Sequence, residues 1–289
     1  MTTVAVIGAG DIGGATAHAL AACDEVGRVL IVDGSANAAA GKALDIQQAG
    51  AIAGFHTRLQ GTDDFTRVTG CSACVVADRF DGTREWSGEE GLAMLVRLIP
   101  ALSGVPIVFA GADQSSLIEL AFRELGVDRR RLVGSAPEAF ASAVRAIVAL
   151  EAGCSPAEVS LAVLGSATGG LVVPWSDASI GGHALEHRLE PIQVTRLEAT
   201  SDRLWPPGPH ALGRAAARVT TAILTSSRRS CSILVALDGE FGVKHGVGVV
   251  PAALSTSGIA ATWTPTITSR ESVRLMTALS TPPQESKHR

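Results

Sequence analysis

The sequence lacks both an apolar run long enough to span a membrane and the positive charge that favours nucleic acid. No segment reaches the roughly 18 apolar residues that a transmembrane helix needs, and the formal net charge is -4 at pH 7. The first residues contain neither a basic region nor a long apolar stretch, so we expect no secretory signal. We therefore predict a cytoplasmic protein that binds neither a membrane nor nucleic acid.

The sequence also lacks the paired cysteines of a disulfide framework. Its 5 cysteines are scattered, which is typical of reduced thiols. Cys71 and Cys74 form a C-x-x-C pair, but an apolar strand continues from Cys74 and no second ligand pair follows, so we interpret both as core residues. His183 and His187 are interpreted as residues of a surface helix, with metal ligation or acid/base chemistry as the alternative. No metal site is predicted.

The chain has 289 residues, of which 46% are hydrophobic, and can bury a sizeable core. Short apolar runs alternate with Ala-rich or amphipathic stretches as far as residues 105–109, a pattern typical of a parallel sheet covered on both faces by helices. After about residue 150 the rhythm changes to β-rich runs around an Ala-rich helix. We predict an α/β fold with a doubly wound parallel Rossmann sheet over 1–150, an α+β domain over 151–280 and a mobile tail over 281–289.

A glycine-rich loop follows the first predicted strand and opens the next helix. Its G-x-G-x-x-G spacing permits a tight turn, the close approach of a pyrophosphate and close packing of the helix on the strand. Asp33 ends the second strand, where a carboxylate can accept hydrogen bonds from ribose hydroxyls and repels a 2′-phosphate. We expect the carboxylate of Asp11, the discordant residue of the loop, to point to solvent. The sequence therefore predicts an NAD site whose residues are Gly8, Gly10, Asp11, Ile12, Gly13 and Asp33.

Motifs along nearly the whole chain resemble those of the lactate and malate dehydrogenases, especially the tetrameric-type malate dehydrogenases. They are IVDG at 31–34 with GKALD at 41–45, RLVG at 131–134, VLG at 163–165 with PWS at 174–176, and GEFGVK at 239–244 with GVVP at 248–251. The resemblance implies that the α+β domain is of that family's substrate-binding kind. It also implies NAD(H) and a small carboxylate as ligands, and a homo-oligomer, either a dimer or a tetramer.

The family's catalytic positions are replaced in this chain. The resemblance aligns Ala167 with the histidine that exchanges a proton with the substrate, and Phe140 with the carboxylate that orients that histidine. Ala143 falls on the arginine that clamps the substrate carboxylate. Both arginines of the family's mobile lid fall on Gly82 and Gly88. These replacements predict that ordinary lactate or malate dehydrogenase activity is absent.

Two further family motifs change near the cofactor. The Thr-Asn-Pro after the fifth strand corresponds to residues 111–113, and the Thr-Ala-Gly turn corresponds to Ala77, Asp78 and Arg79. His210 is a weak candidate for a replacement acid, and Arg84 for a replacement arginine.

Three hypotheses follow. The leading one is an NAD-binding pseudoenzyme or NAD sensor of the lactate and malate dehydrogenase type. The alternative is a working NAD-dependent oxidoreductase that acts on an unusual 2-hydroxy acid or another CH–OH substrate. The third is a scaffold that has lost NAD as well.

Overall fold

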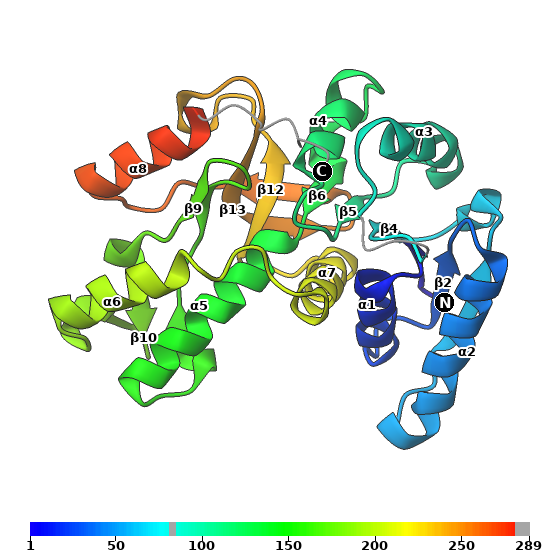
Figure 1. Ribbon diagram of the computed structural model, residues 1–289, viewed down its shortest axis with the longest axis horizontal. Coiled ribbons are helices and arrows are strands. Elements are labelled where there is room, and N and C mark those ends of the chain that lie inside the picture. The colour runs from blue at the N-terminus through cyan, green and yellow to red at the C-terminus, as the bar shows by residue number, and fades with distance from the viewer. Residues whose placement is uncertain (81–84, 281–289) are drawn as a thin grey trace.

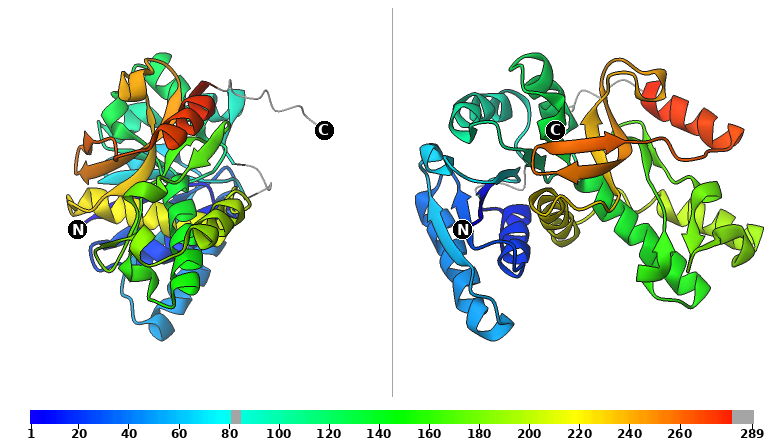
Figure 2. Two further views of the ribbon diagram at one scale, coloured as in Figure 1. Left: turned by 90° about the vertical axis from the view of Figure 1, so that its left-hand side faces the viewer. Right: turned by 180° about the vertical axis from the view of Figure 1, so that it is seen from behind.

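The computed structural model describes residues 1–80 and 85–280, which form a long mixed sheet with helices on both faces (Figures 1 and 2). The parallel strands of this sheet are β1 (Thr3–Ile7), β2 (Arg28–Val32), β3 (Arg58–Thr62), β4 (Ala73–Val76), β5 (Ile107–Phe109) and β6 (Leu132–Gly134). Their spatial order is β3-β2-β1-β4-β5-β6, the order of a doubly wound dinucleotide-binding fold. The predicted Rossmann sheet is therefore confirmed.

The sheet continues without a break into antiparallel strands from the second half of the chain. Strand β12 pairs with β6, and β13 and β8 follow it in turn. These strands are β8 (Leu164–Ser166), β9 (Gly170–Val172), β12 (Cys231–Ala236), β13 (Val247–Ser255) and β14 (Gly258–Thr262), and a separate small sheet holds β7 (Val159–Ser160), β10 (Ser179–Ile180) and β11 (His183–Ala184). Residues 1–150 and 151–280 thus share one sheet, and the division at residue 150 stays a prediction.

The helices divide between the two faces because successive side chains of a strand point in opposite directions. Val4 and Val6 of β1 pack in the core cluster that contains α1 and α7, whereas Ala5 and Ile7 pack in the cluster that contains α3 and α4. Figure 1 shows α1 and α7 side by side, with α3 and α4 on the other side of the sheet. The helices are α1 (Asp11–Ala21), α2 (Ala36–Ala53), α3 (Gly88–Leu98), α4 (Ser115–Arg123), α5 (Ala136–Ala152), α6 (Pro191–Ser201), α7 (Pro209–Leu224) and α8 (Ser269–Ser280).

Several local predictions can be compared directly with the structure. Cys71 and Cys74 are buried free thiols beside β4, which confirms them as core residues. The helix predicted through His183 and His187 is wrong. His183 begins β11 and His187 ends a short 3-10 turn, and both side chains are exposed. The predicted tail at 281–289 lies outside the described residues.

No helix of the described residues is both long and apolar enough to cross a bilayer.

The close packing of α1 on β1 depends on Gly13. A Cβ at Gly13 would collide with the carbonyl oxygen of Gly8, which is backbone and cannot move aside cheaply. We expect Gly13→Ala to lower the free energy of unfolding by about 1–3 kcal/mol, as overpacking of a tight contact does. Thermal unfolding should show a drop in Tm of several degrees.

The matched control is Gly34→Ala, because Gly34 has open space around the position of a Cβ and no left-handed backbone. Equal Tm values for the two variants would contradict this account of the α1–β1 contact.

Candidate cofactor site

The glycine loop lies between β1 and α1, at the point where the strand order of the sheet reverses. Strand β1 has β2 on one side and β4 on the other, and the loops that leave β1 and β4 lie side by side here. Ligands of doubly wound folds bind in the crevice at this point. Gly8 has φ +115°, a conformation that favours glycine, and Gly10 precedes the first residue of α1. The loop is therefore built where the sequence analysis places a dinucleotide.

Asp33 follows β2 and its carboxylate holds three segments of backbone together. Its Oδ2 accepts hydrogen bonds from the amides of Ala9 at 2.9 Å and Phe80 at 3.1 Å, and its Oδ1 accepts one from the amide of Ser35 at 3.0 Å. Asp33 is 4% exposed. The carboxylate predicted to recognise ribose thus has its acceptor oxygens engaged by the chain itself.

Asp78 follows β4 and brings a second carboxylate onto the glycine loop. Its Oδ1 accepts a hydrogen bond from the amide of Gly13 at 2.8 Å, and its Oδ2 accepts one from the amide of Ile12 at 3.1 Å. Its main-chain oxygen accepts a third from the amide of Gly10 at 3.1 Å. The first amides of a helix lack acceptors within the helix and favour an anion. Asp78 supplies that anion from within the chain, and burial raises the pKa of its carboxyl.

The glycines of the loop make the approach of Asp78 possible. A Cβ at Gly8 would collide with the main-chain oxygen of Asp78, and a Cβ at Gly10 would collide with its carboxylate. The G-x-G-x-x-G pattern is therefore needed by the chain itself in this conformation, in addition to any role in binding a pyrophosphate.

Glu85 makes a similar contact with the loop that follows β5. Its carboxylate oxygens accept hydrogen bonds from the amides of Ala112 and Asp113, each at 2.8 Å. Burial is the main reason that the pKa of Glu85 rises from 4.5 to about 7, and the nearby carboxylates of Asp113 and Asp78 raise it further. Glu85 thus caps the loop at residues 111–113, which the sequence motifs align with the family's Thr-Asn-Pro.

The cavity beside Ala167, which the sequence motifs align with the family's histidine, is lined by aromatic and apolar side chains together with Asp202, Arg274 and Thr277. Ala167, Phe140 and Trp205 line a cavity of about 490 Å³. The rings of Phe140 and Trp205 meet edge to face, with their centroids 6.3 Å apart. An alanine beside two aromatic rings cannot carry or orient a proton, so these positions offer no acid/base pair.

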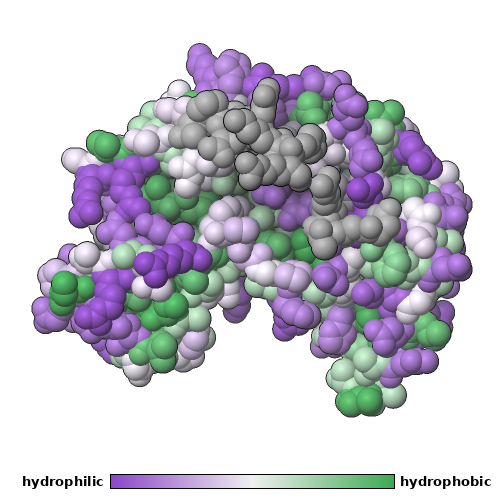
Figure 3. Space-filling view, viewed as in Figure 1, coloured by the Kyte–Doolittle hydropathy of each residue, from purple (hydrophilic) through white to green (hydrophobic). Residues whose placement is uncertain are grey.

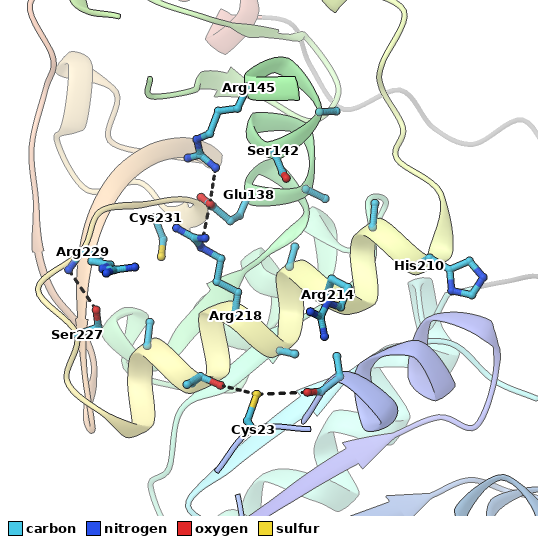
Figure 4. Close-up of a pocket in the computed structure, with 18 of the residues that line it drawn as sticks. Cys23, Glu138, Ser142, Arg145, His210, Arg214, Arg218, Ser227, Arg229 and Cys231 are labelled. Carbon is cyan, nitrogen blue, oxygen red and sulfur yellow. Dashed lines mark hydrogen bonds and ion pairs between the residues drawn. The ribbon is translucent and has the colours of Figure 1, made fainter. Parts of the chain in front are cut away.

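The polar residues of α5 near Phe140 line a different cavity from Ala167. Glu138 is 1% exposed, and its Oε1 pairs with Arg145 at 3.0 Å and Arg218 at 3.2 Å, while its Oε2 accepts from the amide of Ser232 at 3.0 Å. Figure 4 shows Arg145 and Arg218 converging on Glu138 between α5 and α7. Since its partners are these arginines and a backbone amide, Glu138 does not supply a carboxylate at the position of Phe140.

The structure separates the other predicted site residues. His210 is exposed at the start of α7 and, together with Ala143, lines a cavity of about 1000 Å³ between α1, α5 and α7 rather than the cavity at Ala167 (Figure 4). Asp11 is exposed, and Arg84 lies outside the described residues. A catalytic role for either His210 or Arg84 stays a prediction.

Sequence reasoning missed the contacts of Asp78 and Glu85. For Asp78, the signal in the sequence was an acidic residue two positions after the buried strand β4. That strand neighbours β1, which leads into the glycine loop. A carboxylate at that place lies within reach of free helix amides.

Comparisons with known proteins identify the fold of the chain. No family model matches the chain. A malate dehydrogenase of Thioalkalivibrio sulfidiphilus is 27% identical over 276 residues, which cover 90% of both chains. The structure of malate dehydrogenase from Salinibacter ruber superposes with a TM-score of 0.85 at 22% identity, covering 96% of this chain and 94% of that one. This chain has the fold of the malate and lactate dehydrogenases.

The same fold is found in a lactate dehydrogenase from Cryptosporidium parvum complexed with lactic acid and NAD. Its TM-score is 0.86 at 20% identity, and the match covers 96% of this chain and 94% of that one. Ala167 lies between β8 and β9, and the second half of the chain shares the fold of the malate and lactate dehydrogenases as well.

The raised pKa of Glu85 predicts a pH-dependent stability. Because the pKa in the folded chain lies above 4.5, the folded chain holds the proton more tightly, and this stabilisation is full below about pH 4.5 and is lost as the pH rises through 7. We expect the free energy of unfolding of the wild type to fall by about 1–2 kcal/mol relative to Glu85→Gln between pH 5 and pH 8, after allowance for partial exposure. Chemical denaturation at several pH values measures this difference.

Glu89→Gln is the control, since Glu89 is an exposed glutamate in the first turn of α3. Parallel pH profiles for the wild type and Glu85→Gln would show that Glu85 ionises as it does in water.

Proposed function

We propose that this chain binds NAD(H) at the glycine loop and does not carry out ordinary malate or lactate dehydrogenation. The observation that carries the proposal is that the amides of Ile12 and Gly13 already hold a carboxylate at the start of α1. A site that holds one anion in this way has the donors that a pyrophosphate needs. The structural neighbour complexed with NAD, and the extent of the sequence similarity, support the same assignment.

The residues present fit the chemistry of a dinucleotide. Asp78 occupies the space beside Gly8 and Gly10. With Asp78 displaced, these glycines have no side chain to block a phosphate, the helix amides would hold the pyrophosphate, and Asp33 would accept from the ribose hydroxyls. When bound, NAD(H) supplies the capacity for hydride transfer. The Asp33 carboxylate disfavours the 2′-phosphate of NADP(H).

The proposed loss of turnover rests on the residues at positions 167 and 140. Neither Ala167 nor Phe140 can hold or orient a proton, and the ring of Trp205 packs against that of Phe140. Losing an acid/base group costs on the order of a hundred- to ten-thousand-fold in rate. The chain then acts as a binder of NAD(H), a sensor or a pseudoenzyme, with a small carboxylate as a possible second ligand. A cytoplasmic location stays part of this proposal.

Calorimetry with NADH and NADPH, followed by absorbance assays with oxaloacetate, pyruvate and other 2-oxo acids, tests the proposal. We expect saturable NADH binding, binding of NADPH at least tenfold weaker because Asp33 repels the extra phosphate, and rates at least a hundredfold below those of the Salinibacter ruber malate dehydrogenase assayed beside it. Turnover comparable with that enzyme would contradict the proposal and favour an oxidoreductase with a different acid/base residue.

We further propose that the chain forms a homo-oligomer. Leu44 and Ile52 on α2 are 59% and 93% exposed, and the molecule is hollowed between α2 and the lobe that contains α5 and α6 (Figure 3). A second copy of the chain packed on α2 would remove both side chains from water. A second copy of the chain is the partner that the family resemblance predicts.

Light scattering measures the mass. We expect Leu44→Glu to lower it to that of a monomer, because the new charge would be buried without a partner, whereas Val273→Glu on the exposed face of α8 should leave it unchanged. A wild type that is already monomeric would contradict the homo-oligomer.

A further inference from the structure

The segment of residues 77–80 crosses the glycine loop and makes two contacts that a dinucleotide would need. The Asp78 carboxylate accepts hydrogen bonds from the amides of Ile12 and Gly13, which are the donors for a pyrophosphate. Two residues later, the amide of Phe80 donates a hydrogen bond to Oδ2 of Asp33, the acceptor for the ribose. One short segment thus engages both recognition elements of the proposed cofactor site.

The contact is buried and specific. Asp78 is 6% exposed, and both of its carboxylate oxygens accept backbone hydrogen bonds. Its main chain is fixed as well, since its carbonyl accepts from Gly10 and the preceding Ala77 amide donates to the carbonyl of Ile7. A phosphate cannot reach the same amides while the carboxylate is there, because two anions cannot share one set of donors.

Neighbouring side chains hold the segment in place. The side-chain amide of Gln114 donates to the carbonyl of Ala77 at 2.8 Å, which ties the segment to the start of α4. The guanidinium of Arg79 lies over the ring of Trp86, 5.4 Å from its centroid, and pairs with Glu90 of α3 at 2.7 Å. The segment is therefore anchored on both sides of Asp78.

The energetic balance of this contact allows it to open. The helix amides stabilise the Asp78 carboxylate, but burial removes water from it, and the pKa of the carboxyl stays above its ordinary value. The pyrophosphate of a dinucleotide carries two negative charges against one on the carboxylate, so it gains more from the helix terminus. The internal carboxylate has the advantage of being tethered to the site, which gives it a high effective concentration.

We propose that Asp78 is an internal competitor of the dinucleotide, whose carboxylate must leave the start of α1 before a pyrophosphate can bind there. This inference rests on the proposed NAD(H) site. The apparent affinity for NADH is then the intrinsic affinity reduced by the fraction of molecules in which the site is free. The competitor gives the chain a site that fills only when the dinucleotide is abundant.

Calorimetric titration of the full chain with NADH tests the competition. Asp78→Ala removes the carboxylate and restores the residue that stands at this place in the family's Thr-Ala-Gly turn, and we expect it to lower the dissociation constant at least tenfold. Asp78→Asn keeps the size of the side chain but not its charge, so it should change the affinity in the same direction if Asp78→Ala does not fold. Without NADH both variants should have a lower Tm than the wild type, because the start of α1 loses its anion.

The matched control is Asp63→Ala. Asp63 is an exposed carboxylate just after β3, at the same edge of the sheet, and its removal changes the net charge by the same amount. NADH affinity should stay at the wild-type value in this variant. A gain equal to that of Asp78→Ala would show that general electrostatics, rather than occupation of the site, limits binding, and would overturn the proposal.

Two further outcomes separate this inference from the proposed function. Equal NADH affinities for the wild type and Asp78→Ala would overturn the internal competition and leave the NAD(H) site standing. If no variant binds NADH, the proposed function fails, and inorganic pyrophosphate then decides the competition. Tighter pyrophosphate binding by Asp78→Ala than by the wild type would support it, and equal binding or none would overturn it.

Discussion

The amides at the start of a helix have no acceptor within the helix. Those of α1 lie where the strand order of the sheet reverses. The loops leaving β1 and β4 must lie side by side there, so an acidic residue two positions after β4 can reach the amides of Ile12 and Gly13. The conformation of the glycine loop, the burial of Asp33 and the path of residues 77–80 all follow from that contact. The same donors that suit a pyrophosphate are used to fold the apo chain.

At the positions that the family resemblance assigns to the acid/base pair, this chain has apolar side chains. Ala167 and Phe140 stand where the family resemblance places a histidine and its carboxylate, and Trp205 packs against Phe140. Glu138, two residues before Phe140 on α5, pairs with Arg145 and Arg218. Under the proposed function, the chain keeps the donors of a dinucleotide site at the start of α1 and lacks an acid/base pair at Ala167 and Phe140.

The sequence predicts those features that depend on neighbours along the chain. Alternating apolar runs, the glycine spacing and Asp33 at the end of β2 are local patterns, and they predict the Rossmann half correctly. The contact between Asp78 and Gly13 spans 65 positions, so it becomes visible only when β1 and β4 are known to be adjacent. The helix expected at His183 and His187 failed for a related reason, because pairing of β11 with β10 outweighs the spacing of the two histidines.

A crystal structure of the wild-type chain grown with saturating NADH decides whether Asp78 and the dinucleotide compete for the start of α1. We expect a pyrophosphate on the amides of Ile12 and Gly13, with the Asp78 carboxylate displaced from both and the Phe80 amide withdrawn from Asp33. A dinucleotide bound in the crevice while Asp78 keeps its two hydrogen bonds to α1 would contradict the competition.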